Sequence, residues 1–307
     1  MKLDQFYTGR AAAELCWKLC QRTLARLPVD PVASRHFFIE PSAGSGAFYE
    51  LLPEDRRIGV DLAPAGRGIL QRDFLNWHYR PPAQKHSVIA VGNPPFGTRG
   101  KHAAQFINHA ATLADTIAFI LPAIFRKFSA QRLVNPQLRL ILSESLPLDS
   151  FVLPARQNGQ EGRPYRINTV FQIWTRLPSR HKNLRECKPP KIHHPDFTAR
   201  QYNNTREALR VFTLPFDFAI PCQGWQDYSR RETTAAACEK NKQWILLKPN
   251  HKTAHHILFH QINYTKLAQE NGTTTPGFRK NDLVRTYEAI TPPNRDSILR
   301  TNLSSRE

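Results

Sequence analysis

The chain has 307 residues and a formal net charge of +18, with 43 lysines and arginines against 25 aspartates and glutamates. Its length accommodates two domains, and so basic a balance favours a polyanionic partner, nucleic acid before an anionic membrane surface. The start of the chain is polar from Lys2 to Gln5 and no apolar run reaches about eighteen residues, so we expect neither a signal segment nor a membrane span. We therefore expect a cytoplasmic protein.

The cysteine and histidine patterns argue against a metal site. The cysteines are odd in number and form no Cys-x-x-Cys pair, which indicates a reducing compartment. The paired histidines at 193–194 and 255–256 have no cysteine or carboxylate at metal-ligand spacing. We expect a protein that binds no metal and whose thiols are unpaired: Cys16, Cys20, Cys187, Cys222 and Cys238.

Helices and strands alternate along the first 176 residues. Apolar residues at helical spacing predict a helix over 9–27 with Thr8 as its N-cap, and further helices over 47–52, 101–114 and 133–142. Short apolar runs predict strands at 36–39, 57–60, 86–91, 116–121, 150–153 and 168–174. Because these strands are apolar throughout instead of alternating, they indicate a mostly parallel, doubly wound sheet that is covered on both faces.

Polar residues close or follow several of these strands. Glu40, Asp61 and Asn93 come directly where strands run out, and Asp73 follows a short apolar segment. In doubly wound sheets ligands bind beyond the carboxyl ends of the strands. We therefore expect these four residues to converge on one edge of the sheet.

A glycine-rich turn, Glu40-Pro41-Ser42-Ala43-Gly44-Ser45-Gly46, follows the first predicted strand. Asp61 closes the next strand at the position that usually binds ribose hydroxyls. The full GxGxxG pattern is absent, so a nucleoside without phosphates is favoured over a dinucleotide, and a purely structural turn is the alternative. Asp73 and Phe74 have the chemistry to hold an adenine, or else are a solvated carboxylate and a core ring.

The stretch Gly92-Asn93-Pro94-Pro95-Phe96-Gly97 follows a buried strand. Its prolines fix the backbone and remove two N–H donors, and Asn93 is biased toward an extended conformation. The Asn93 amide and a backbone carbonyl then offer two acceptors for an amine, and Phe96 offers a ring face. This arrangement suits a planar ring that bears an amine.

Five segments in order resemble a known family: Asp4-Gln-Phe-Tyr-Thr8, Glu40-Pro-Ser-Ala-Gly-Ser-Gly-Ala-Phe48, Asp61, Asp73-Phe74 and Asn93-Pro-Pro-Phe96. They resemble the S-adenosylmethionine-dependent amino-methyltransferases that act on adenine in DNA, in the gamma order of motifs. The resemblance covers residues 1–176. It implies a seven-stranded, Rossmann-like class I methyltransferase fold with S-adenosylmethionine as cofactor.

The resemblance also assigns roles to individual residues. Asn93, Pro94, Pro95 and Phe96 would form the catalytic motif, in which Asn93 and the Pro94 carbonyl accept hydrogen bonds from the target amine and Phe96 stacks on the target base. Phe171 would cover the other face of that base, unless it is an inward-facing core residue. The cofactor-binding residues implied by the resemblance are Phe6, Tyr7, Thr8, Glu40, Pro41, Ala43, Gly44, Asp61, Asp73 and Phe74.

The C-terminal part has another composition. Residues 177–200 are expected to form a basic linker, 201–290 a nucleic-acid and target-recognition region, and 291–307 a disordered tail. Basic residues of this region are expected to contact phosphates, with single solvated charges as the alternative: Arg230, Arg231, Lys248, Arg279 and Lys280.

These observations predict methyl transfer to the N6 amine of adenine in DNA, by a monomer acting on a base that is flipped out of the duplex. Activity on RNA adenines is the alternative within the same chemistry, and cytosine amines or a protein glutamine amide share the motif. A nucleic-acid-binding protein that has lost activity is the alternative of another class. No carboxylate–lysine cluster indicates a nuclease, so a solitary methyltransferase acting on the nucleoid is expected instead of a restriction-modification pair.

Overall fold

The computed structural model describes residues 7–27, 36–79, 87–152, 164–224, 227–272 and 275–291. The chain divides into two compact units, residues 1–189 and 190–307, and each is described by itself. Phe6 and the predicted tail from 292 to 307 lie outside the described residues.

Unit 1 is built on a seven-stranded sheet in the order β4-β3-β2-β5-β6-β10-β7. The first five strands in that order run parallel, and β10 is antiparallel to both of its neighbours. The strands are β2 (Phe37–Glu40), β3 (Arg57–Asp61), β4 (Ile69–Gln71), β5 (Val88–Gly92), β6 (Thr116–Pro122), β7 (Arg139–Ser145) and β10 (Thr169–Thr175). The prediction of a mostly parallel seven-stranded sheet is confirmed.

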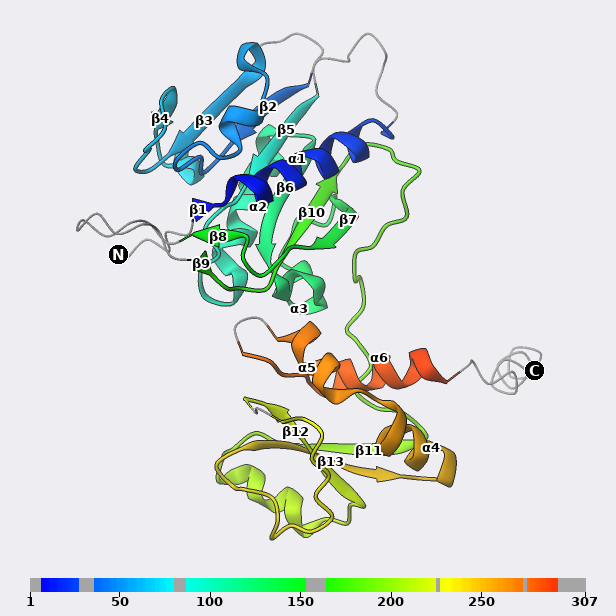
Figure 1. The fold of residues 1–307 in the computed structure, drawn as a ribbon. Helices are drawn as coiled ribbons and strands as arrows, with labels where there is room; N and C mark the ends of the chain where they lie inside the picture. Colours follow the sequence, from blue (N-terminus) through cyan, green and yellow to red (C-terminus); the bar gives the residue numbers. More distant parts are fainter. Residues whose placement is uncertain are drawn as a thin grey trace, which may run out of the picture. The chain divides into compact units, whose positions relative to one another are not determined.

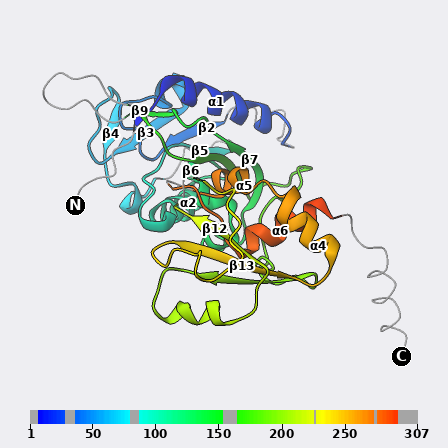
Figure 2. The ribbon, with the colours of Figure 1, turned by 60° about the horizontal axis from the view of Figure 1, so that its bottom comes forward.

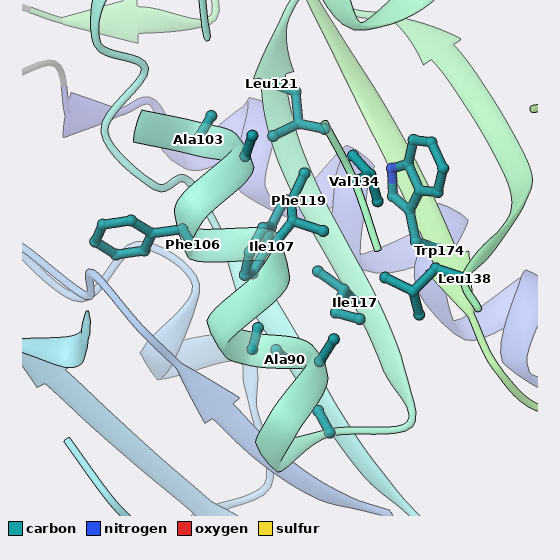
Figure 3. Close-up of a cluster of buried hydrophobic side chains, with 14 of the residues drawn as sticks. Ala90, Ala103, Phe106, Ile107, Ile117, Phe119, Leu121, Val134, Leu138 and Trp174 are labelled. Carbon is teal, nitrogen blue, oxygen red and sulfur yellow. The ribbon is translucent and has the colours of Figure 1, made fainter. Parts of the chain in front are cut away.

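Both faces of this sheet are covered, as Figure 1 shows for helices α1 (Arg10–Leu24) and α2 (Lys101–Leu113). Alternate residues of one strand enter different cores: Ile120 of β6 belongs to the cluster that contains α1, whereas Phe119 belongs to the cluster that contains α2. Figure 3 shows the second cluster, with Ile107 of α2 lying over the apolar side chains of β6. Burial on both faces explains why the strands read as continuous apolar runs.

Two local predictions were wrong, and one predicted strand lies in another sheet. The segment 133–142 was expected as a helix. Helix α3 (Phe128–Gln131) ends before this segment, and from Arg139 the chain forms strand β7, which pairs with β10 at the sheet edge. The strand expected at 150–153 is β8 (Phe151–Val152), which joins β1 (Tyr7–Thr8) and β9 (Pro164–Tyr165) in a separate small sheet. Thr8 lies in that sheet and Gly9 is the N-cap of α1. Pairing over distance outweighed local spacing in each case.

Short 3₁₀ segments join these elements: η2 (Tyr49–Leu51), η3 (Glu54–Arg56), η4 (Phe74–Asn76), η5 (Thr98–Gly100) and η6 (Ala123–Arg126). The helix expected over 47–52 is thus a single 3₁₀ turn. The helix expected over 101–114 is α2.

Residues 176–189, here called the strap, belong to unit 1. The guanidinium of Arg185 donates to four carbonyls, those of Gln131, Val134, Asn135 and Leu138, at 2.6 to 3.1 Å. Arg139 donates to the carbonyls of residues 179 and 181. The boundary between units therefore falls at residue 189, inside the predicted linker of 177–200.

Unit 2 contains a three-stranded antiparallel sheet in the order β11-β13-β12, from β11 (Phe197–Tyr202), β12 (Phe218–Gln223) and β13 (Gln243–Pro249). In Figures 1 and 2, α4 (Lys252–His256), α5 (Tyr264–Asn271) and α6 (Lys280–Ile290) lie on one side of β13. The 3₁₀ segment η7 (Glu207–Thr213) packs against a second apolar cluster, which contains Trp244 and Leu246 of β13. Helix α4 continues as one π-helical turn, Ile257–Gln261.

All five cysteines are free thiols, and four of them are buried. Within the described ranges, no helix has the length and apolar character needed to cross a membrane. The same part of the chain holds no group of three or more His, Cys, Asp or Glu side chains placed to bind a metal ion.

Candidate active site

One cavity of about 620 Å³ opens at the carboxyl edge of the sheet in unit 1. It is lined by Glu40 at the end of β2, Asp61 at the end of β3, Asp73 after β4 and Asn93 after β5. The predicted convergence of these four residues is confirmed. Because the strand ends meet at one edge, residues from a stretch of 54 positions, Glu40 to Asn93, lie on the same cavity.

The glycine-rich turn forms one wall of this cavity and is fixed by Asp61. One carboxylate oxygen of Asp61 accepts a hydrogen bond from the Gly44 N–H, and the other accepts from the Ala63 N–H, both at 2.8 Å. Gly44 has a φ of +49°, and a Cβ there would lie 3.2 Å from the Tyr7 ring. Only glycine suits this close approach, so the turn, Tyr7 and Asp61 hold one another in place.

Glu40 is buried at the base of the cavity, with 2% of its surface exposed. Its Oε2 atom has no hydrogen-bond partner within the described ranges. Burial raises the pKa of this carboxyl well above its usual range, and the nearby charge of Asp61 raises it further, while a backbone hydrogen bond from Tyr49 acts in the opposite direction. A buried carboxylate of this kind needs a cation or a donor to offset its desolvation.

Asp73 and Phe74 form another part of the wall. Asp73 accepts from the Leu75 N–H at 3.1 Å and from the Asn76 side-chain amide at 2.6 Å, so it also caps the η4 turn. Phe74 is 2% exposed and its ring stacks with that of Phe106 at 5.4 Å. Phe74 is therefore both a core residue and a residue that lines the cavity.

The Asn93–Phe96 motif lies beside these carboxylates. The Ser42 hydroxyl donates to the Asn93 carbonyl at 3.0 Å, which fixes the backbone of the turn. In contrast, the Asn93 Oδ1 atom is buried and has no partner in the described part of the chain. Phe96 is 7% exposed and lines the cavity, with its ring edge-on to that of Phe151 at 6.3 Å. The unpaired amide oxygen thus belongs to a residue that lines the cavity, as Phe96 also does.

Phe171 does not line this cavity. It is fully buried in β10, opposite Ile120 of β6, and belongs to the apolar core on the α1 side of the sheet. The structure therefore gives Phe171 the core role that was the alternative at the sequence level.

Several lining residues were missed from the sequence: Thr98, Lys101, His102, Gln105 and Phe106, together with Arg72. The first five follow the motif, where Gly97 and Gly100 adopt φ values of +63° and +73° and turn the chain into α2. The His102 Nδ1 atom lies 3.0 Å from the Gln105 Oε1 atom. The two glycines close to the motif were the available signal that the following turn stays at the site.

The basic residues selected in unit 2 fall into two groups. Arg230 pairs with Glu232 and Glu239 at 2.8 and 2.9 Å, and Arg231 donates to three backbone carbonyls and lies over the Tyr264 ring. Both guanidiniums therefore have partners within unit 2, and their role as phosphate contacts stays a prediction. Lys248 and Arg279 are exposed, and Lys280 is half-buried.

The strand order, the single antiparallel strand β10 and the helices on both faces define the Rossmann-like class I methyltransferase fold. No protein-family model matches the chain, and no curated protein matches it either. Among solved structures, a "putative RNA methyltransferase" from Pyrococcus horikoshii is 18% identical with a TM-score of 0.37, over 57% of this chain and 88% of its own. The type IIL restriction-modification enzyme MmeI, solved in complex with DNA, is 9% identical with a TM-score of 0.47, over 94% of this chain and 67% of its own. These similarities are too weak to transfer a function, which is therefore inferred from the residues of the site.

Proposed function

We propose that this protein transfers a methyl group from S-adenosylmethionine to the N6 amine of adenine in DNA. The observation that carries the proposal is the buried, unpaired Oδ1 of Asn93, a residue that lines the same cavity as Glu40, Asp61 and Asp73. An acceptor without a partner suits a substrate amine, and three carboxylates suit a ligand with hydroxyl, amine and cationic groups.

The chain's residues fit the cofactor. Asp61 is held by two backbone N–H groups, and each of its oxygens retains a lone pair for a ribose hydroxyl. The buried Glu40 carboxyl is destabilised as an anion unless a cationic group lies near it. Tyr7, Thr8 and the Pro41–Gly44 turn would enclose the methionine part, and Asp73 with Phe74 the adenine. When bound, S-adenosylmethionine supplies a methyl group that is activated by its sulfonium.

The motif residues prepare the acceptor amine. The lone pair of an exocyclic ring amine is conjugated, so the amine is a weak nucleophile. Hydrogen bonds from it to the Asn93 Oδ1 and to the Pro94 carbonyl would favour developing tetrahedral character at nitrogen. The Ser42 hydroxyl and the two prolines hold these acceptors in place before substrate arrives, so positioning supplies much of the acceleration.

The charge of the chain and the shape of the site favour a nucleic acid as the owner of that amine. A net charge of +18 suits a polyanion. A base stacked inside a duplex cannot enter such a cavity, so it must be flipped out or lie in a single strand. Phe96 would stack on the extruded base, and such stacking contributes about 1–3 kcal/mol per base.

The test is transfer of labelled methyl to DNA, RNA and protein in parallel, followed by identification of the methylated group in the acceptor. We expect N6-methyladenine in DNA, and Asn93→Ala should abolish it while S-adenosylmethionine still binds. Label in RNA or in protein instead would replace DNA as the substrate. Undiminished transfer by Asn93→Ala would remove the motif from the mechanism. Absence of both transfer and cofactor binding would leave a nucleic-acid-binding protein.

A further inference from the structure

A buried pair of glutamines lies in unit 1 outside the cavity, and the proposed chemistry does not use it. Gln131 of α3 is 2% exposed and Gln172 of β10 is fully buried. Both side-chain amides donate to one backbone carbonyl, that of Phe125, at 2.8 and 3.0 Å. Two lone pairs of one oxygen are thus held from two elements that lie 41 positions apart in sequence.

Each glutamine is itself held by other groups. The Gln172 amide also donates to the Ser143 hydroxyl, and its oxygen accepts from the Trp174 indole N–H, at 3.1 Å in both cases. The Gln131 oxygen accepts from the Glu186 N–H of the strap at 2.6 Å. Apart from one N–H of the Gln131 amide, every N–H and oxygen of the two side chains therefore takes part in one of these hydrogen bonds. Satisfied buried polar networks specify one arrangement, because breaking any member leaves orphaned groups.

The side chain of the same residue, the Phe125 ring, contacts the turn that leads into α2. It is fully buried, and a Cβ at Gly100 would lie 2.9 Å from its Cε2 atom. Gly100 precedes the first residue of α2. The backbone there is thus seated directly against the Phe125 ring.

The start of α2 is joined in turn to the Asn93–Phe96 motif. The Ala103 N–H donates to the Phe96 carbonyl, and the Gly100 N–H donates to the Gly97 carbonyl, both at 3.3 Å. The prolines of the motif offer no N–H of their own. The C-terminal side of the motif is therefore fixed through this turn.

We propose that Gln131 and Gln172 are positioning residues for methyl transfer. They clamp the Phe125 carbonyl, the Phe125 ring seats Gly100, and the turn at Gly97–Gly100 aligns Asn93 and Phe96. This inference rests on the proposed function, because methyl transfer is the reaction whose geometry the clamp sets. Neither glutamine lines the cavity, so their effect belongs to alignment and not to ligand contact.

The variants Gln131→Met and Gln172→Met keep the side-chain length and remove the amide. Each should lower kcat about tenfold or more, since misplacement on the ångström scale can cost about 10²-fold. The KM for S-adenosylmethionine and the calorimetric stoichiometry of its binding should stay unchanged, which separates misalignment from loss of folded protein. The matched control is Thr116→Val, which removes a buried hydroxyl–hydroxyl hydrogen bond at the other end of β6 and should leave kcat unchanged.

Hydrogen exchange gives a readout that does not need catalysis. The Gly100 and Ala103 amides should exchange faster in both glutamine variants than in the wild type or in Thr116→Val. Wild-type kcat with unchanged exchange in both variants would overturn the clamp. If the wild type methylates no acceptor, the proposed function fails, and the exchange of these two amides still decides whether the clamp exists. If one variant does not fold, the other carries the same comparison.

Discussion

At the residue scale, the site depends on polar atoms that lack partners. Glu40 Oε2 and Asn93 Oδ1 are buried and unpaired in the described part of the chain, although most buried polar atoms in proteins are paired. Both atoms lie on residues that line the same cavity. The simplest physical account is that a bound ligand supplies the missing hydrogen-bond donors. The carboxylates of Glu40 and Asp61 each give a prediction.

The first prediction concerns Glu40→Gln and pH. The folded-state pKa of Glu40 is raised, so below its unfolded value near 4.5 the carboxyl is protonated in both states and adds no pH dependence. As pH rises above that value the unfolded state ionises first, and the wild type loses stability until pH passes the folded pKa. Glu40→Gln lacks this loss. In urea unfolding without cofactor, its advantage over the wild type should grow with pH by up to about 1.4 kcal/mol per unit. An advantage equal at pH 5 and pH 8 would contradict the raised pKa.

The second prediction concerns Asp61→Asn. The wild-type carboxylate accepts from two backbone N–H groups, whereas an asparagine amide can accept with one atom only. Loss of a hydrogen bond to a charged group costs about 1.5–3 kcal/mol, so cofactor affinity measured by calorimetry should fall about 10- to 100-fold. Asp55→Asn, an exposed change outside the cavity, is the control and should bind as the wild type does. Equal affinity for both variants would remove Asp61 from the cofactor site.

At the scale of elements, the strap shows how a charged segment becomes part of a core unit. Arg185 of the strap donates to four carbonyls between Gln131 and Leu138, in the segment that follows α3. Burial lowers the pKa of this guanidinium, so hydrogen bonds to carbonyls offset a real desolvation cost. Composition alone made the same residues look like a free linker.

Arg185→Met should therefore destabilise unit 1. We expect its free energy of unfolding to fall by about 2–4 kcal/mol, because several carbonyls lose a charged donor at once. Lys182→Met, an exposed change on the same strap, should alter stability by less than about 0.5 kcal/mol. Urea unfolding of both variants measures the difference. Equal stability of the two would mean that the strap does not stabilise unit 1.

The same scale shows what the sequence could and could not predict. Apolar runs located five of the seven strands of the main sheet, and polar residues at their ends located four walls of the cavity. Strand β7 was missed because a short apolar run fits both periods, and its pairing with β10 decided the outcome. The two roles of Phe171 stayed open at the sequence level for a related reason: which face a strand residue occupies depends on register, and a shift of one position reverses it.

At the scale of the whole molecule, net charge predicts a polyanionic partner but does not say which lysine and arginine side chains contact it. Arg230 and Arg231 carry two of the charges, yet their guanidiniums are engaged inside unit 2. Lys248 on β13 is exposed instead. A count of basic residues therefore overstates the charge available to a ligand, and the structure separates the two kinds.

That separation gives the last prediction. Lys248→Ala should weaken DNA binding and reduce the slope of log affinity against log salt by about one, because one released counterion is lost. Its stability should match that of the wild type. Arg231→Met should do the reverse: its guanidinium is half-buried over the Tyr264 ring, so the variant loses stability while the salt slope stays the same. Binding isotherms at several salt concentrations and urea unfolding of both variants measure the two quantities. A reduced salt slope in Arg231→Met with unchanged stability would make that arginine a phosphate contact after all.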